Sequence, residues 1–143
     1  MRKSVGFLGL ILVMLMFAGC LGAGIAITIT PNPIELTFGD DSTEVTINVR
    51  TQGFGSLRID SIIAELIDED EQVVDSHETV LDLTLPVVPG LTHPEVIEIR
   101  LPEEYVYPTE EEYNKALLGK SFKVNVSITG SNPVQSKALV KFL

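Results

Sequence analysis

The sequence predicts a mainly all-β fold, an antiparallel β-sandwich of about seven to nine strands with one short helix near residues 110–118. Three observations lead to this prediction. Apolar and polar residues alternate through most of the chain, which is typical of strands with one buried face. Turn-forming residues interrupt this alternation about every ten residues. The 143 residues include a single cysteine, so the core has to hold without disulfide bonds.

The first strand is expected at residues 25–30, and it resumes at residues 34–38 after the break at Pro31-Asn32-Pro33. A strand broken by prolines suits a sheet edge, and it can pass from one sheet of a sandwich to the other. Residues 43–51 alternate most clearly of all and are predicted to form the next strand.

Residues 57–67 carry apolar side chains on both faces after Ser61, which predicts a central strand. Such a strand is either covered on both sides or bulged near Ile62-Ile63, and the pattern leaves both alternatives open. Further strands are predicted at residues 72–75, 80–88 and 96–101, with breaks at Pro89-Gly90 and His93-Pro94.

One short helix is predicted within residues 102–120. Thr109 stands three residues before Glu112, the spacing of a capping box in which the threonine oxygen accepts from a first-turn amide. Acidic residues in the first turn also complement the positive end of the helix dipole. Gly119 sits where helices commonly end. Two strands then close the chain, one before and one after a turn at residues 130–133. Their inward-facing residues are expected to be Phe122, Val124, Val126 and Ile128 in the first and Ala138, Val140 and Phe142 in the second.

Residues 33–67 resemble the immunoglobulin-like domains of prokaryotic surface proteins. The shared features are Pro33, Leu36 and Phe38, the 43–51 strand and a glycine loop before Leu57. The resemblance implies an immunoglobulin-like sandwich over residues 25–143, without the disulfide and tryptophan of antibody domains. A sandwich of the late-embryogenesis or water-stress type, which also carries one helix, is the alternative within this class.

The first residues of the chain have the parts of an export signal in order. Arg2 and Lys3 provide a positive start, Val5 to Ala18 is uncharged and apolar, and small residues lead into Cys20. Phe17-Ala18-Gly19-Cys20 resembles the lipobox of prokaryotic lipoproteins, departing from it at Phe17, where leucine is commoner. The resemblance implies a lipid thioether on the Cys20 sulfur and cleavage after Gly19.

The expected organisation is therefore a lipoprotein signal peptide at residues 1–19, a lipidated anchor and linker at 20–24, and the sandwich at 25–143. An uncleaved membrane span is the main alternative, because Val5 to Ile27 is uncharged and about 20 residues suffice to cross a bilayer. Simple secretion is a third possibility. In each case the positive residues hold the amino end in the cytoplasm and the domain lies on the extracytoplasmic face.

The charge balance argues against one class of partner. The chain has 20 acidic and 10 basic residues and a net charge of −10. A domain so negative is repelled by nucleic acid, so no nucleic-acid partner is expected. The expected partners are the membrane, through the lipid, and an unknown envelope or surface protein.

No catalytic residues are predicted. Asp75-Ser76-His77 has the residue types of a catalytic triad, but neighbours in a strand point to opposite faces. His93 precedes a proline and is expected in a solvated turn. Gly119-Lys120-Ser121 follows the predicted helix, whereas phosphate-binding loops precede theirs.

Three weaker sites are considered. Asp68, Asp70 and Glu71 lie at a predicted hairpin tip and provide the oxygen ligands that calcium prefers, although acidic tips are usually just solvated. Tyr105, Tyr107 and Tyr113 lie among glutamates; they either form a partner contact or cap the end of the sandwich under the helix. Asn125 begins a glycosylation sequon on a strand position expected to face outward.

The function expected from the sequence is a non-catalytic, lipid-anchored interaction or envelope-maintenance module at the cell membrane. No cofactor is expected apart from the covalent lipid on Cys20. Two alternatives remain: a small extracytoplasmic hydrolase using Glu103 or Glu104 with Glu110 to Glu112, and a calcium-stiffened adhesion module.

Overall fold

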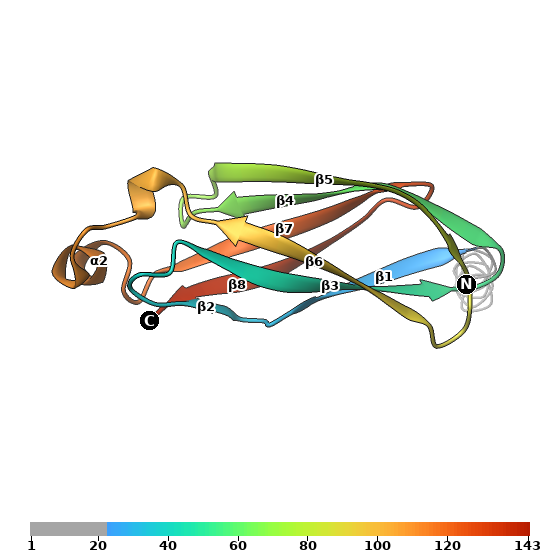
Figure 1. Ribbon diagram of the computed structural model, residues 1–143, viewed down its shortest axis with the longest axis horizontal. Helices are drawn as coiled ribbons and strands as arrows, with labels where there is room; N and C mark the ends of the chain where they lie inside the picture. Colours follow the sequence, from blue (N-terminus) through green and yellow to red (C-terminus); the bar gives the residue numbers. More distant parts are fainter. Residues whose placement is uncertain (1–22) are drawn as a thin grey trace, which may run out of the picture.

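The structure is a computed structural model that describes residues 23–143, and these form two β-sheets packed face to face (Figure 1). One sheet has the strand order β1-β3-β6 and the other the order β2-β8-β7-β4-β5. The predicted signal peptide and Cys20 lie outside the described residues. The elements are β1 Gly24–Thr30, β2 Ile34–Leu36, β3 Ser42–Gln52, β4 Ser56–Ile67, β5 Val73–Pro86, β6 Thr92–Arg100, η1 Glu103–Tyr105, α2 Glu110–Ala116, β7 Ser121–Gly130 and β8 Val134–Phe142.

The prediction of a β-sandwich of about seven to nine strands with one short α-helix is confirmed for these residues, which form eight strands in two sheets. Its first strand does change sheets. β1 pairs antiparallel with β3, from Gly24 opposite Gln52 to Thr30 opposite Thr46. After the proline break, β2 pairs with β8 of the other sheet, and this pair is parallel. The prolines end the first pairing because their nitrogens cannot donate to the ladder.

The core is a layer of aliphatic side chains between the sheets. Alternate residues of each strand point inward, so β3 contributes Val45, Ile47 and Val49, each at most 1% exposed. β7 and β8 contribute the predicted inward residues Phe122, Val124, Val126, Ile128, Ala138, Val140 and Phe142, all buried. A fully buried aliphatic side chain of this kind stabilises the fold by about 2 kcal/mol.

β4 is central and bulged, which decides between the two predicted alternatives. Its register shifts between Ile59 and Ser61 against both neighbours, so the irregularity lies at Asp60, two residues before the predicted position. Leu57 and Ile59 point inward before the shift, and Ile62, Ala64 and Leu66 do so after it. The bulge thus changes which alternate residues face the core, and this produces the two-faced apolar pattern.

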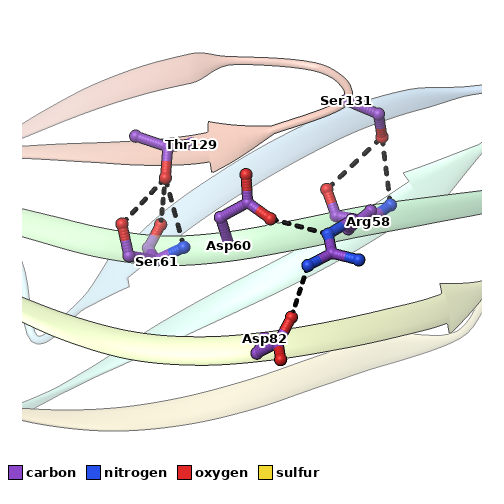
Figure 2. A network of polar contacts seen from close by, with 6 residues as sticks. All are labelled: Arg58, Asp60, Ser61, Asp82, Thr129 and Ser131. Atoms are coloured by element: carbon purple, nitrogen blue, oxygen red, sulfur yellow. Dashed lines mark hydrogen bonds and ion pairs between the residues drawn. The ribbon is translucent and has the colours of Figure 1, made fainter.

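Hydrogen bonds and ion pairs hold the bulge in place (Figure 2). On the outer side, Arg58 Nε lies 2.8 Å from Asp60 Oδ1, and Arg58 Nη2 lies 2.6 Å from Asp82 Oδ1. Asp82 belongs to β5 and has a φ of 45°, a left-handed conformation that aspartate tolerates better than most residues. All three side chains are largely exposed, so these pairs orient the strands and add little stability.

β7 and the turn after it hold the other side of the bulge (Figure 2). The buried Ser61 lies with its Oγ 2.8 Å from Thr129 Oγ1, which also accepts from the Ser61 amide at 3.1 Å. The Arg58 amide donates to Ser131 Oγ at 3.0 Å, and the Ser131 amide donates to Arg58 O at 3.0 Å. Backbone groups displaced from the ladder therefore find partners in two hydroxyls.

Two strand boundaries differ from the prediction. Residues 76–79, left between two predicted strands, belong to one continuous strand β5, and Pro94 lies inside β6 rather than before it. β5 and β6 are each the last strand of their sheet. An edge strand exposes one row of backbone groups to water, so it accepts polar runs and a proline that a central strand would not.

No helix in residues 23–143 is long and apolar enough to cross a membrane. β1 begins at Gly24, so the last residues of the uncharged run considered for an uncleaved span are paired in a sheet.

Gly130→Ala is expected to lower the free energy of unfolding by about 3 kcal/mol. Gly130 has a φ of 145°, and a Cβ there would lie 2.0 Å from the carbonyl oxygen of Arg58, beside the bulge. Gly24→Ala is the matched control, because its nearest neighbour would be Gln52 O at 4.0 Å. Urea denaturation of both variants checks this, and equal midpoints would contradict it.

Candidate interaction surface at the acidic end

One end of the sandwich gathers more than half of the chain's 20 acidic residues. We call it the acidic end. It is formed by the β2–β3 turn, the β4–β5 turn, η1 and α2, which lie together at the left of Figure 1. Its acids are Asp40, Asp41, Asp68, Glu69, Asp70, Glu71, Glu103, Glu104, Glu110, Glu111 and Glu112.

Aromatic rings fill the interior of this end. Tyr113 lies edge-on to Phe38 and Phe142, with ring centroids 5.9 and 6.5 Å apart. Phe122 lies edge-on to Phe142 at 5.0 Å and to Tyr105 at 5.1 Å. Edge-to-face pairs place positive ring edges against negative faces, which stabilises them beyond their buried area. The rings close the end of the aliphatic core.

Tyr113 is held here by the capped helix α2. Thr109 Oγ1 accepts from the Glu112 amide at 3.3 Å, as the capping sequence predicted. The Tyr113 hydroxyl donates to Leu36 O at 3.0 Å, with Leu143 O a second acceptor at 3.2 Å. Tyr113 therefore ties α2 to β2 and to the end of β8.

The partner contact predicted at Tyr113 is wrong, because this side chain is only 4% exposed. The alternative prediction, that the rings cap the sandwich, describes it correctly. Burial, helped by the negative charge of Asp40, raises the pKa of the Tyr113 phenol.

Tyr105 and Tyr107 are half-buried and line two recesses in the surface of the acidic end. The larger recess, about 320 Å³, also has Asp68, Asp70 and Lys120 on its walls. The smaller, about 70 Å³, includes Asp40, Asp41 and the exposed edge of Phe38. Burial raises the pKa of the Tyr105 phenol, and the charges of Glu104 and Asp68 add to the effect. These two rings are thus tyrosines beside carboxylates, an arrangement suited to contacting a cationic surface.

Two of the three carboxylates considered for calcium, those of Asp68 and Glu71, have other partners. Asp68 Oδ1 accepts from the amides of Asp70 and Gln72, both at 2.9 Å, and so closes its own turn. Glu71 pairs with Lys123 at 2.7 Å, which lowers the pKa of Glu71. Within residues 23–143, no three His, Cys, Asp or Glu side chains are placed to hold a metal ion. The Asp68 carboxylate is therefore used within the turn and the Glu71 carboxylate is paired with β7, whereas Asp70 joins the turn through its backbone amide.

The glutamates considered for a hydrolase lie apart from any enclosed site. Glu103, Glu104 and the three glutamates at the start of α2 are all exposed. Glu103 does border a recess of about 430 Å³ at the edge between β5 and β6, together with His77, Glu98 and Arg100. The α2 glutamates do not line that recess, so the predicted pairing of Glu103 with Glu110 to Glu112 is not formed.

The remaining predicted positions are placed as follows. Ser76 and His77 are neighbours on the extended strand β5, as expected. His93 is not in a turn but within β6, with Nε2 2.7 Å from Glu95 Oε1.

Asn125 lies in the middle of the five-stranded sheet, between Glu65 of β4 and Lys137 of β8. It is only 8% exposed, its amide nitrogen lies 3.4 Å from Glu65 Oε1, and its Oδ1 has no hydrogen-bond partner among residues 23–143. Asn125 does lie on the outward face, as predicted, but neighbouring side chains cover its amide. This burial argues against glycosylation of the folded domain.

Lys120 and Lys123 are members of this surface that the sequence did not indicate. Lys120 lines the larger recess, and Lys123 forms the ion pair with Glu71. Their places depend on β7 lying beside β4, a pairing between segments about 60 residues apart for which the local sequence carries no signal.

Tyr113→Phe is expected to reduce the loss of stability at high pH. The phenol pKa values of Tyr113 and Tyr105 are raised in the fold, so their contribution is full below about pH 10 and is lost as the pH rises further. At neutral pH the variant should be about 1 kcal/mol less stable than the wild type, because it lacks the hydrogen bond of the phenol. As the pH rises above about 10, the variant should lose less further stability than the wild type, because phenylalanine cannot ionise.

Urea denaturation across this pH range measures the effect. Phe142→Leu is the control, because it weakens the same packing without removing an ionisable group. A Tyr113→Phe variant whose stability falls with pH as steeply as that of Phe142→Leu would contradict the assignment.

Comparison with known proteins supports the fold. No protein-family model matches the chain, and no curated protein matches it. Among solved structures, the sporulation control protein Spo0M from Bacillus subtilis is similar with a TM-score of 0.51 and 15% identity, over 83% of this chain and 49% of that one. The chain thus spans about half the length of Spo0M.

Two further solved structures are similar to this chain at a lower TM-score. The apo-form Calx CBD1 domain matches with a TM-score of 0.46 and 12% identity, over 83% of this chain and 97% of that one. The ApaA protein from Bordetella pertussis matches with a TM-score of 0.46 and 13% identity, over 85% and 94%. At such identities the likeness to Spo0M concerns the architecture alone, and we draw nothing from the two weaker ones. The chain is an all-β sandwich.

Proposed function

We propose that this protein is a lipid-anchored, non-catalytic interaction module on the extracytoplasmic face of a prokaryotic membrane. The observation that carries the proposal is Ala18-Gly19-Cys20 at the end of the uncharged run, directly before the sandwich. A lipid on Cys20 would hold the domain at the bilayer, provided that a second acyl chain is present, since one chain binds only marginally.

The acidic end is the surface proposed to meet a partner. It combines exposed carboxylates with the half-buried rings of Tyr105 and Tyr107, and its larger recess offers space for a side chain of the partner. A partner with a positively charged surface fits this chemistry, because complementary charge speeds encounter and selects against like-charged proteins.

Cys20→Ser tests the anchor. In a prokaryotic host that processes lipoproteins, the wild-type protein is expected in the membrane fraction, starting at Cys20 and carrying the mass of a lipid. Cys20→Ser should keep Met1 and carry no lipid, because serine offers no sulfur for the thioether. Phe17→Leu, which restores the commoner lipobox residue, is the control and should be processed like the wild type.

Intact mass spectrometry of the membrane and soluble fractions gives the readout. A wild-type protein that retains Met1 and an unmodified thiol contradicts the proposed lipid anchor. If that protein and Cys20→Ser are both held in the membrane, the uncleaved span is the correct description.

Charge reversal tests the partner surface. Asp70 and Glu104 are exposed and their charges act on Tyr105. Asp70→Lys with Glu104→Lys is expected to reduce the crosslinked yield of a partner in native membranes several-fold, because the attraction is replaced by repulsion. Glu44→Lys with Glu78→Lys makes the same change of charge at exposed positions of β3 and β5, outside the segments that form this end, and should retain the crosslink. Equal yields from the two pairs would exclude the acidic end as the contact.

A further inference from the structure

The end of the sandwich opposite the acidic end is built from four segments that contact one another. Gly24 pairs with Gln52 at the end of β3. The Val87 amide donates to Gly55 O at 2.9 Å, joining the β5–β6 loop to the β3–β4 loop. Asn132 in the β7–β8 turn donates through its side chain to Ala23 O. We call residues 23–24, 52–56, 86–92 and 130–134 the anchor end; it lies at the right of Figure 1.

The anchor end exposes apolar side chains. Phe54 is 79% exposed at the tip of the β3–β4 loop, between two glycines of positive φ. Val88 and Leu91 are 45% and 43% exposed in the β5–β6 loop, where the Leu91 amide donates to Val88 O. Gathered apolar side chains at one end of a soluble domain usually mark a surface that something covers.

The same four segments contain no Asp, Glu, Lys or Arg. The charged residues of the domain lie on the strands and at the acidic end instead. Charge is therefore distributed unequally along the long axis of the domain. One end carries carboxylates, and the other exposes apolar side chains on segments without charge. An anionic bilayer would repel the first end, whereas the second can enter the headgroup region of any bilayer without desolvating a charge.

The length of chain before the sandwich indicates what covers the anchor end. Cys20 precedes Ala23 by three residues, so the attached lipid and Ala23 are at most about 11 Å of chain apart. This step rests on the proposed lipid anchor. A domain tied so closely has its anchor end at the level of the lipid headgroups, whatever path the connecting residues take.

We infer that the anchor end is a membrane-contact surface, with Phe54, Val88 and Leu91 entering the headgroup region of the bilayer. The contact orients the sandwich with its long axis away from the membrane, so that the acidic end faces outward. Aromatic and aliphatic side chains on uncharged loops are suited to this interface, because they bury apolar area without desolvating a charge.

Single tryptophans test the orientation, since the chain has none of its own. Phe54→Trp places a reporter at the anchor end, and Leu118→Trp is the matched control, because Leu118 is 50% exposed just after α2. Each full-length lipidated variant is reconstituted into phosphatidylcholine vesicles with brominated acyl chains. Bromine quenches only nearby indoles, so quenching of Phe54→Trp is expected to exceed that of Leu118→Trp several-fold.

Sedimentation with the vesicles separates the failure of the anchor from the failure of this inference. Variants that remain in the supernatant contradict the anchor and, with it, the orientation. Variants that sediment but show equal quenching, or none, leave the anchor standing and overturn the membrane contact. An emission of Phe54→Trp that is blue-shifted without bromine quenching would place a second copy of the protein on this end, and it also overturns the inference.

Discussion

The structure depends on one layer of apolar side chains between two sheets, and no Asp, Glu, Lys or Arg of residues 23–143 is buried in that layer. Val45, Ile47 and Val49 of β3 meet residues such as Val124, Val126 and Val140 of the facing sheet, and all are at most 1% exposed. Because strands alternate, this requirement uses every second residue of the central strands. The outer faces, the edges and the two ends remain free to differ, and the functional features of this chain lie at the ends.

Two irregularities make the layer possible. The break at Pro31-Asn32-Pro33 lets the first strand contribute an edge to both sheets, since β1 pairs with β3 and β2 pairs with β8. Asn32 adds a side-chain oxygen that accepts from the Leu139 amide at 3.3 Å. The bulge at Asp60 shifts which residues of β4 point inward. Gly130 is needed beside it, because a Cβ at this position would collide with the backbone carbonyl of Arg58. At both irregularities, side-chain oxygens accept hydrogen bonds from backbone amides, those of Arg58, Ser61 and Leu139.

The two ends differ in how they are closed. At the acidic end, rings from Phe38, Tyr113 and Phe142 cover the core, and the carboxylates outside them are solvated or paired within turns. At the anchor end, Phe54 points away from the core rather than over it. In a domain held close to a bilayer, this difference would let the anchor end contact the lipid and leave the acidic end facing outward.

The sequence by itself determined the strands, the helix and the strand exchange, because alternation, capping and prolines act over a few residues. It also indicated the bulge in β4, although not its position at Asp60, which depends on the register with β5 and β7. Only the tertiary structure decided that Tyr113 is core while Tyr105 and Tyr107 line the surface, that Asn125 is covered, and that Glu71 pairs with Lys123. These outcomes depend on which segments are neighbours, and pairing between distant strands leaves no mark on the local pattern of either one.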